Sequence, residues 1–261
     1  MAVFNKLKDV ISRQSFLFSE LVKRDFKKKY KRTYLGMLWS VMSPLLSILV
    51  MYVVFNNFYK NGDGFFITYL FCGNIVFAFF SDSSNGGMES LLGNADIFSK
   101  INLPKYLFLF SRTVSSLINF SLTFGVFLIF CAIDGVPFTL YFLGLIIPIV
   151  LLIIFNLGVG MILSALYVFF RDVKYLWGIF LMFVMYLSAI FYDVSMLPEA
   201  VRQLLILNPV YVYISYFRTL VIGAAFPPMY LTALAVGYAI LFFTVGMVIY
   251  KRYNHKFIYY V

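Results

Sequence analysis

Charge is scarce in this chain: only 12% of its 261 residues are Asp, Glu, Lys or Arg, while 62% are hydrophobic. A soluble domain of this length carries about twice that charged fraction. The deficit excludes a soluble globular domain and favours a protein whose surface faces lipid.

Chemically reactive side chains are also few. The chain contains one histidine, His255, and two cysteines, Cys72 and Cys131. A single histidine argues against a Ser–His–Asp relay and a zinc site, and both cysteines fall within apolar runs as expected of buried thiols. Glycine is nowhere followed by lysine, so the P-loop sequence that holds ATP phosphates is absent. We therefore expect no enzyme activity and no cofactor or metal bound by this chain itself.

What the chain has instead is six long stretches without a charged residue. They cover residues 33–59, 64–81, 113–133, 135–170, 175–192 and 219–250 and are 18 to 36 residues long. A helix needs about 20 residues to cross a hydrocarbon core of about 30 Å, and these runs lack the strict alternation of barrel strands. The expected fold is an all-α integral membrane protein with six transmembrane helices. The expected spans are 35–57, 65–84, 108–133, 140–168, 175–192 and 229–250.

The basic residues are concentrated on one side of this topology. If the loops alternate from an inner N-terminus, 18 of the 21 Lys and Arg residues fall on the inner side, and Lys60, Arg202 and Arg218 fall on the outer side. The positive-inside rule predicts this bias for a protein with both termini in the cytoplasm. The net charge of +10 therefore indicates orientation in the plasma membrane rather than a nucleic-acid partner.

Two segments outside the spans have distinct patterns. Residues 1–32 are basic with apolar residues at helical spacing, which predicts a cytoplasmic amphipathic helix at the membrane interface, against lipid headgroups. The rest of the chain, 33–261, forms the transmembrane domain. Before the last span, residues 193–228 contain an uncharged run that is too short to cross the bilayer and is interrupted by Pro209. We expect this segment to form a re-entrant hairpin that acts as an outer gate.

Charged residues are missing from the centres of the spans. Ion-coupled secondary transporters usually place ionisable groups there, so a secondary transporter or channel is disfavoured. A membrane-embedded transferase acting on lipid-linked sugars would need a base, a metal site or paired carboxylates, and only the scattered Asp82, Asp96 and Asp172 are available. Asp82 and Arg112 lie near the ends of neighbouring spans, where a structural ion pair and a role in substrate entry both remain open.

Aromatic residues make up 21% of the chain. Rings that gather at the two membrane interfaces account for many of them. The alternative is a pathway whose ring faces pack against the C–H faces of sugars. The candidates for such a pathway are Tyr34, Trp39, Tyr69, Trp177 and Tyr186.

Four motifs together resemble the permease subunits of ABC exporters for polysaccharides and teichoic acids. The first runs from Arg-Asp through a basic stretch with Tyr to Leu-Gly-x-Leu-Trp and a proline in the first span. Its residues here are Arg24, Asp25, Tyr30, Leu35, Gly36, Trp39 and Pro44. The other three are the segment 94–106, Phe-Arg-Asp-Val at 170–173 and Leu-Asn-Pro at 207–209.

The resemblance implies a subunit that moves a lipid-linked polysaccharide or teichoic acid from the cytoplasmic to the outer side of a bacterial plasma membrane. It further implies a homodimer bound to two copies of a separate ABC ATPase subunit, which would hold ATP and Mg. The loops 88–100 and 171–174 would dock on that ATPase, and residues 88–99 are expected to form a short helix. The contact residues would be Glu89, Asp96, Lys100, Arg171 and Asp172. Asn208 and Pro209 would belong to the outer gate.

Overall fold

The computed structural model describes residues 16–27, 33–55, 65–98 and 104–260, and within these ranges it is helical with no strand. An N-terminal helix covers residues 16–27. The long helices after it are α2 (Trp39–Phe55), α3 (Phe66–Glu89), α5 (Tyr106–Ile133), α6 (Ile146–Phe169), α7 (Val173–Leu187) and α10 (Met229–Tyr253). The short ones are η1 (Gly36–Leu38), η2 (Leu92–Asn94), α4 (Ala95–Phe98), η3 (Leu140–Leu145), η4 (Val194–Met196), α8 (Glu199–Leu205), α9 (Pro209–Val221) and α11 (Phe257–Tyr260). The expected all-α class is confirmed.

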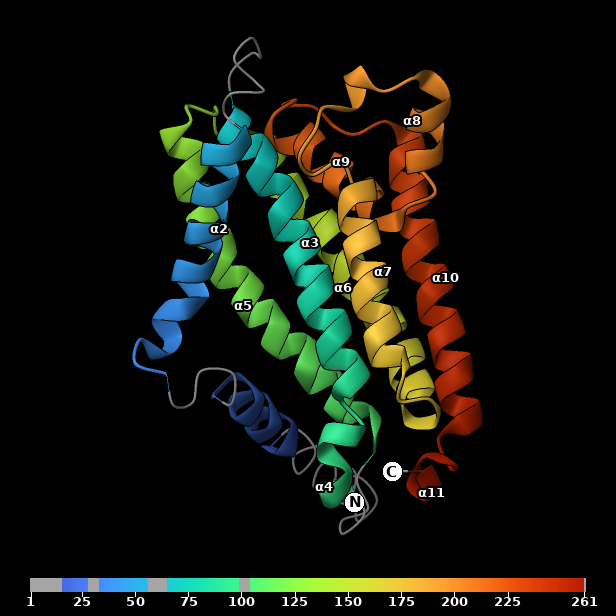
Figure 1. Cartoon of the computed structure of the whole chain (residues 1–261). Coiled ribbons are helices and arrows are strands. Elements are labelled where there is room, and N and C mark those ends of the chain that lie inside the picture. The colour runs from blue at the N-terminus through green and yellow to red at the C-terminus, as the bar shows by residue number, and fades with distance from the viewer. Residues whose placement is uncertain (1–15, 28–32, 56–64, 99–103, 261) are drawn as a thin grey trace, which may run out of the picture.

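The long helices run lengthwise through one elongated bundle (Figure 1). The helix 16–27, α4 and α11 lie at one end, which we call the α4 end. The helices α8 and α9 lie toward the opposite end, which we call the α8 end. Successive long helices run in opposite directions between these two ends.

Glycines allow α3, α6 and α10 to pack closely. A Cβ atom on Gly158 of α6 would lie 2.4 Å from the carbonyl carbon of Phe242 on α10, and one on Gly246 would lie 2.6 Å from the Gly158 oxygen. Between α3 and α6, a Cβ on Gly87 would lie 2.8 Å from the Cα of Gly160. Small residues of this kind let helix backbones approach each other in a membrane, where no hydrophobic force drives helices together.

Among the residues that the structure describes, four segments are long and apolar enough to cross a membrane: α3, α5, α10 and the continuous stretch Leu140–Phe169. The helices α2 and α7 have 17 and 15 residues, or about 26 and 22 Å at 1.5 Å per residue. The pair α8 and α9 is bent by 101° and would provide a fifth crossing only if it spanned as one unit.

The α4 end of α3 differs from the expected structure. Residues 88–99 do not form one helix, because α3 continues to Glu89 and is followed by η2 and α4. The side-chain nitrogen Nδ2 of Asn94 donates a hydrogen bond of 2.7 Å to the carbonyl oxygen of Ser90. This bond satisfies a carbonyl group just beyond α3 and holds the chain in the turn that separates the helices.

The helix α7 ends at Leu187, five residues before the expected end at 192. Two residues later Ala189 has φ of +49°, a left-handed conformation that interrupts a helix. The hydroxyl of Ser188 donates to the carbonyl oxygen of Val184 at 2.6 Å. The broken segment after α7 therefore brings carbonyl groups to the α8 end that need donors from elsewhere.

Candidate functional site

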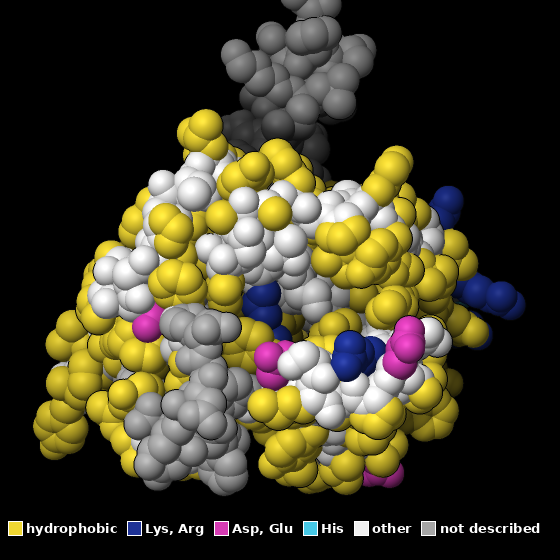
Figure 2. Space-filling model, turned by 90° about the horizontal axis from the view of Figure 1, so that it is seen from above, with side chains coloured by type: hydrophobic (Ala, Val, Ile, Leu, Met, Phe, Trp, Pro, Cys, Tyr) yellow, Lys and Arg dark blue, Asp and Glu magenta, His cyan; other side chains and the backbone are white. Residues whose placement is uncertain are grey.

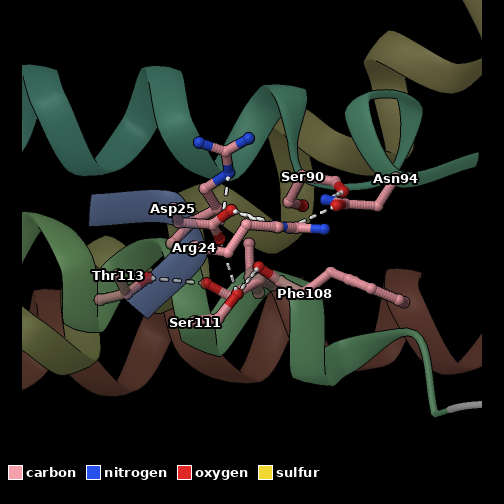
Figure 3. Close-up of polar contacts among 9 residues, drawn as sticks. Arg24, Asp25, Ser90, Asn94, Phe108, Ser111 and Thr113 are labelled. Carbon is pink, nitrogen blue, oxygen red and sulfur yellow. Dashed lines mark hydrogen bonds and ion pairs between the residues drawn. The ribbon is translucent and has the colours of Figure 1, made fainter. Parts of the chain in front are cut away.

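A buried carboxylate, that of Asp25, joins the N-terminal helix to α5 (Figure 3). The Asp25 side chain is only 1% exposed. Its Oδ1 accepts hydrogen bonds from Nε and Nη2 of Arg24 at 3.1 and 2.7 Å. Its Oδ2 accepts one from Oγ of Ser111 at 3.0 Å and lies 3.5 Å from Nε of Arg112. A carboxylate removed from water is tolerated only with such partners, so these contacts fix residues 16–27 against α5.

Arg24 extends this cluster to the loop after α3. Its Nη2 also donates to Oδ1 of Asn94 at 2.6 Å, and Asn94 is itself 2% exposed. The Arg-Asp pair of the first sequence motif thus connects the N-terminal helix, α5 and η2. The sequence left open an ion pair of Arg112 with Asp82, and the structure places Arg112 beside Asp25 instead.

A second contact joins the two loops at the α4 end. Nζ of Lys174, at the start of α7, lies 2.8 Å from Oε1 of Glu89, at the end of α3. Both side chains are about half exposed. Asp96 on α4 and Asp172 before α7 are exposed, so both loops carry accessible carboxylates at the α4 end.

The other residues predicted for this end are placed as follows. Nη2 of Arg171 donates to the carbonyl oxygen of Tyr260 in α11 at 3.3 Å. Gly36 begins η1 with φ of +50°, a conformation that favours glycine. Tyr30 and Lys100 lie outside the described residues.

A groove lined by hydroxyl and amide groups lies between α2, α3 and α5, with a volume of about 550 Å³. We call it the polar groove. Its polar side chains are Thr33, Ser40, Ser43, Ser47, Asn74, Asn119 and Thr123. Trp39 and Pro44 of the first motif also line it, and Pro44 lacks the amide hydrogen of a regular helix position. The described residues that line this groove are uncharged, so neutral donors and acceptors dominate its chemistry.

The predicted pathway aromatics do not gather in one place. Trp39 lines the polar groove, whereas Tyr34 and Tyr186 are exposed. Trp177 lines an apolar pocket of about 380 Å³ that includes residues of α6, α7 and α10, and its Nε1 donates to Oγ of Ser84 at 3.2 Å. Tyr69 lies at the α8 end, where its hydroxyl donates to the carbonyl oxygen of Tyr192 at 2.7 Å.

Arg218 of α9 joins three elements at the α8 end. Its Nη1 donates to the carbonyl oxygen of Ala189 at 2.8 Å, and Nη2 donates to those of Tyr69 and Ile190 at 3.2 Å. Its guanidinium carbon lies 3.4 Å from the centre of the Tyr69 ring, a cation–π contact. Figure 2 shows Lys and Arg side chains inside the hollow of this end, within a largely hydrophobic surface. Arg218 therefore supplies donors to the broken backbone after α7.

Asn208 and Pro209 form the start of α9. Oδ1 of Asn208 accepts a hydrogen bond from the amide of Val210 at 3.0 Å, and Pro209 occupies the first turn, where no amide hydrogen is needed. Nδ2 of Asn208 donates to Oγ of Ser188 at 2.9 Å and to the carbonyl oxygen of Leu187 at 3.2 Å. The Asn-Pro motif thereby ties the bend between α8 and α9 to the end of α7.

Comparison with known proteins gives a consistent result over nearly the whole chain. Residues 17–222 match the family described as ABC-2 type transporter. The chain is 28% identical over 248 residues to the O-antigen export system permease protein RfbA of Klebsiella pneumoniae, covering 93% of this chain and 95% of the relative. It is 21% identical to the capsule polysaccharide export inner-membrane protein CtrC of Neisseria meningitidis, over 75% of each chain. It is 22% identical to the polysialic acid transport protein KpsM of Escherichia coli, over 75% of this chain and 77% of the relative.

These matches agree with the helical structure and with the apolar segments long enough to cross a membrane. The family match alone covers more than three quarters of the chain. The protein is therefore a multi-pass membrane permease that belongs to the ABC-2 type transporter family.

Proposed function

We propose that this permease exports a lipid-linked polysaccharide or teichoic acid from the cytoplasmic to the outer side of the plasma membrane. It would do so as a homodimer, driven by two copies of a separate ABC ATPase subunit that bind ATP and Mg. The similarity to O-antigen and capsule export permeases supports the class of cargo.

The polar groove carries this proposal. A glycan presents hydroxyl groups that need hydrogen-bond partners once water is removed, and the serines, asparagines and threonines of the groove offer such partners without charge. Rings pack against the C–H faces of sugars, and Trp39 supplies one beside these side chains. A groove of this composition suits the hydroxyl-rich units of such a cargo better than a small ion.

Six crossings are the topology that we propose, with α2 and α7 added to the four long segments. Both added helices run lengthwise beside the long ones (Figure 1), and a modest shortfall in length is met by local thinning of the bilayer. The α8–α9 pair would then be re-entrant, and helix 16–27 would lie at the membrane interface. An even number of crossings leaves both termini on the same side of the membrane, at the α4 end. The positive-inside rule makes that side the cytoplasm.

The α4 end would face the ATPase. Asp96 and Asp172 are exposed there, Glu89 at the end of α3 is about half exposed, and the Glu89–Lys174 pair joins the two loops directly. The Asp25 cluster joins the same region to the N-terminal helix and α5. A displacement of either loop would therefore be passed to helices that border the polar groove.

The test uses proteoliposomes that contain the full chain with its co-expressed ATPase. Lipid-linked glycans should stimulate ATP hydrolysis, and the double variant Ser47→Leu with Asn74→Leu should reduce this stimulation at least about tenfold, because leucines remove hydrogen-bonding groups from the groove. Ser121→Leu is the matched control, since Ser121 is exposed on α5 outside the groove lining. Full stimulation of the double variant would exclude the groove as the path. Failure of any ATPase subunit to co-purify would exclude ATP-driven export by this chain.

A further inference from the structure

A second groove lies at the α4 end, on the opposite side of α5 from the polar groove. It has a volume of about 420 Å³ and is lined by residues at the start of α5, the end of α10 and Met161 of α6. Its apolar part includes Phe110, Phe243 and Met247. Met247 is 47% exposed and Tyr106 is 44% exposed, so the groove opens at the side of the bundle.

Two lysines stand at the polar edge of this groove. Lys105, directly before α5, is only 8% exposed, and its Nζ donates to the carbonyl oxygen of Asn254. Burial lowers the pKa of the Lys105 ammonium, because loss of water disfavours the charged form. Lys251 is exposed and lines the same edge from α10. An anion bound between these lysines would gain attraction from both and would offset the desolvation of Lys105.

A third residue with a polar group, Tyr250, lines the groove. Tyr250 is 7% exposed, and within the described residues its hydroxyl oxygen is buried without a hydrogen-bond partner. Its ring is held in place by an edge contact with Phe257 at 5.3 Å between centroids. A buried hydroxyl normally has a partner, and a tyrosine hydroxyl can donate to a phosphate oxygen. The orphaned hydroxyl of Tyr250 thus points independently to a missing acceptor.

The groove combines a short apolar channel, open at the side of the bundle, with cations and a donor at the end nearest the aqueous phase. We propose that it binds an anionic phospholipid, with the phosphate between Lys105, Lys251 and Tyr250 and an acyl chain along Phe110, Phe243 and Met247. Juxtamembrane lysines attract anionic lipid headgroups in this way.

The phosphate of an isoprenoid carrier has the same chemistry, but the position of the groove favours a resident phospholipid. The helix α5 separates this groove from the polar groove, so the phosphate of a carrier seated here would lie across α5 from the hydroxyl groups between α2 and α3. The inference requires only that the chain lies in a membrane. It does not depend on what the protein exports.

Native mass spectrometry of the purified full chain in detergent tests this assignment. Dioleoyl phosphatidylglycerol and dioleoyl phosphatidylcholine are titrated separately, and phosphatidylglycerol should bind at least about fivefold more tightly. Lys251→Gln should weaken phosphatidylglycerol binding about fivefold, since one cation near a membrane surface contributes about that factor. Tyr250→Phe removes only the hydroxyl and should weaken binding about threefold. Lys105 is left unchanged, because its contacts with α10 and α11 also support the fold.

Arg252→Gln is the matched control, because it removes one charge from the neighbouring, exposed position outside the groove lining. It should change the affinity less than about twofold. Equal weakening by Arg252→Gln and Lys251→Gln, or equal binding of the two phospholipids, would overturn the site. Undecaprenyl phosphate forms the third arm of the titration. Displacement of phosphatidylglycerol by this carrier at tenfold lower concentration would overturn the assigned occupant.

Discussion

Ion pairs join helices at the α4 end of the bundle, whereas the contacts described at the α8 end are mainly hydrogen bonds to backbone carbonyl groups. Lys105 and Arg171 also donate to carbonyl groups at the α4 end. At the α4 end, carboxylates meet cations: Asp25 pairs with Arg24 and Arg112, and Glu89 pairs with Lys174. At the α8 end, polar side chains donate to backbone carbonyl groups. Arg218 does so at three residues, as do Asn208 at Leu187 and Tyr69 at Tyr192.

This difference separates a region suited to rearrangement from one suited to keeping an irregular backbone intact. Two side chains in an ion pair can exchange partners while the helices that carry them stay folded. A donor that satisfies the carbonyl at a broken helix end has no such freedom, because the abandoned carbonyl would lack a partner at membrane depth. The half-exposed Glu89–Lys174 pair at the α4 end is therefore the contact that a docking partner can alter at low cost.

The largest effect should come from the buried carboxylate at the α4 end. Asp25→Ala leaves Arg24 and Arg112 without their shared partner in a site from which water is mostly excluded, which we expect to cost about 3–5 kcal/mol. The measurement is thermal stability of the detergent-solubilised chain by size-exclusion chromatography after heating. Ser111→Ala removes one hydrogen bond to the same carboxylate and should cost only about 1 kcal/mol. Equal stabilities of the two variants would show that the charge of Asp25 does not hold this end together.

A smaller loss is expected from the corresponding change at the α8 end. Arg218→Met removes charge-assisted hydrogen bonds to the carbonyl groups of Tyr69, Ala189 and Ile190, with an expected cost of about 2 kcal/mol. Arg202→Met is the matched control, because Arg202 is exposed and also donates to two carbonyl groups. We expect the control to change stability by less than about 0.5 kcal/mol. Similar losses of stability in both variants would mean that the Arg218 contacts are no more stabilising than those of the exposed Arg202.

The helical class was predictable from the sequence, because charge-free runs of membrane length need no knowledge of their neighbours. The contacts at the two ends were harder to predict from the sequence. Asp25 was identified by its motif, but its partner Ser111 and the Arg24 partner Asn94 are 86 and 70 residues away along the chain. Arg218 was counted only as an outer basic residue, because the sequence does not show which backbone carbonyl groups lack a donor.

One wall of the polar groove was predictable from the sequence, although the aromatic residues were taken as the pathway candidates instead. Ser40, Ser43 and Ser47 recur at helical spacing within the first charge-free run, and this spacing places them on one face of α2. Their partners Asn74 and Asn119 come from other runs, so the groove itself could not be assembled from the sequence. The five aromatic candidates carried no such spacing, and the structure distributes them over the bundle.

At the exposed loops of the α4 end, the expected effect is on export rather than on stability. The double variant Glu89→Lys with Asp96→Lys should abolish ATP-driven export, because it reverses the charge that the loop after α3 presents to the ATPase. The protein should still insert and elute as a single peak, since Asp96 is exposed and the Glu89 side chain is about half exposed. Export is measured as glycan accumulation outside proteoliposomes.

A charge swap separates the contact between the loops from the contact with the ATPase. Glu89→Lys combined with Lys174→Glu restores an ion pair between α3 and α7 with its charges reversed. Recovery of export by the swap would indicate that the link between the loops transmits the motion. Unchanged export in the original double variant would remove both carboxylates from the coupling surface.

The smallest expected effect on the protein comes from single cysteine substitutions, which test which end of the bundle faces outward. Ser195 and Ala225 are exposed on either side of the α8–α9 pair, whereas the native Cys72 and Cys131 are buried. In intact cells, Ser195→Cys and Ala225→Cys should both react with an impermeant thiol reagent, and His255→Cys at the α4 end should react only after permeabilisation.

The geometry of the pair explains why both labels are expected on the same side. The helices α8 and α9 have 7 and 13 residues, about 10 and 20 Å of helix, and they meet at 101°. Neither covers a hydrocarbon core of about 30 Å, and the bend prevents their lengths from adding. A single crossing here would also carry Lys251, Arg252 and Lys256 to the outer side, against the positive-inside rule. Outside labelling of Ser195→Cys alone, with Ala225→Cys reached only from the cytoplasm, would show that the pair spans and that the α4 and α8 ends do not divide inside from outside.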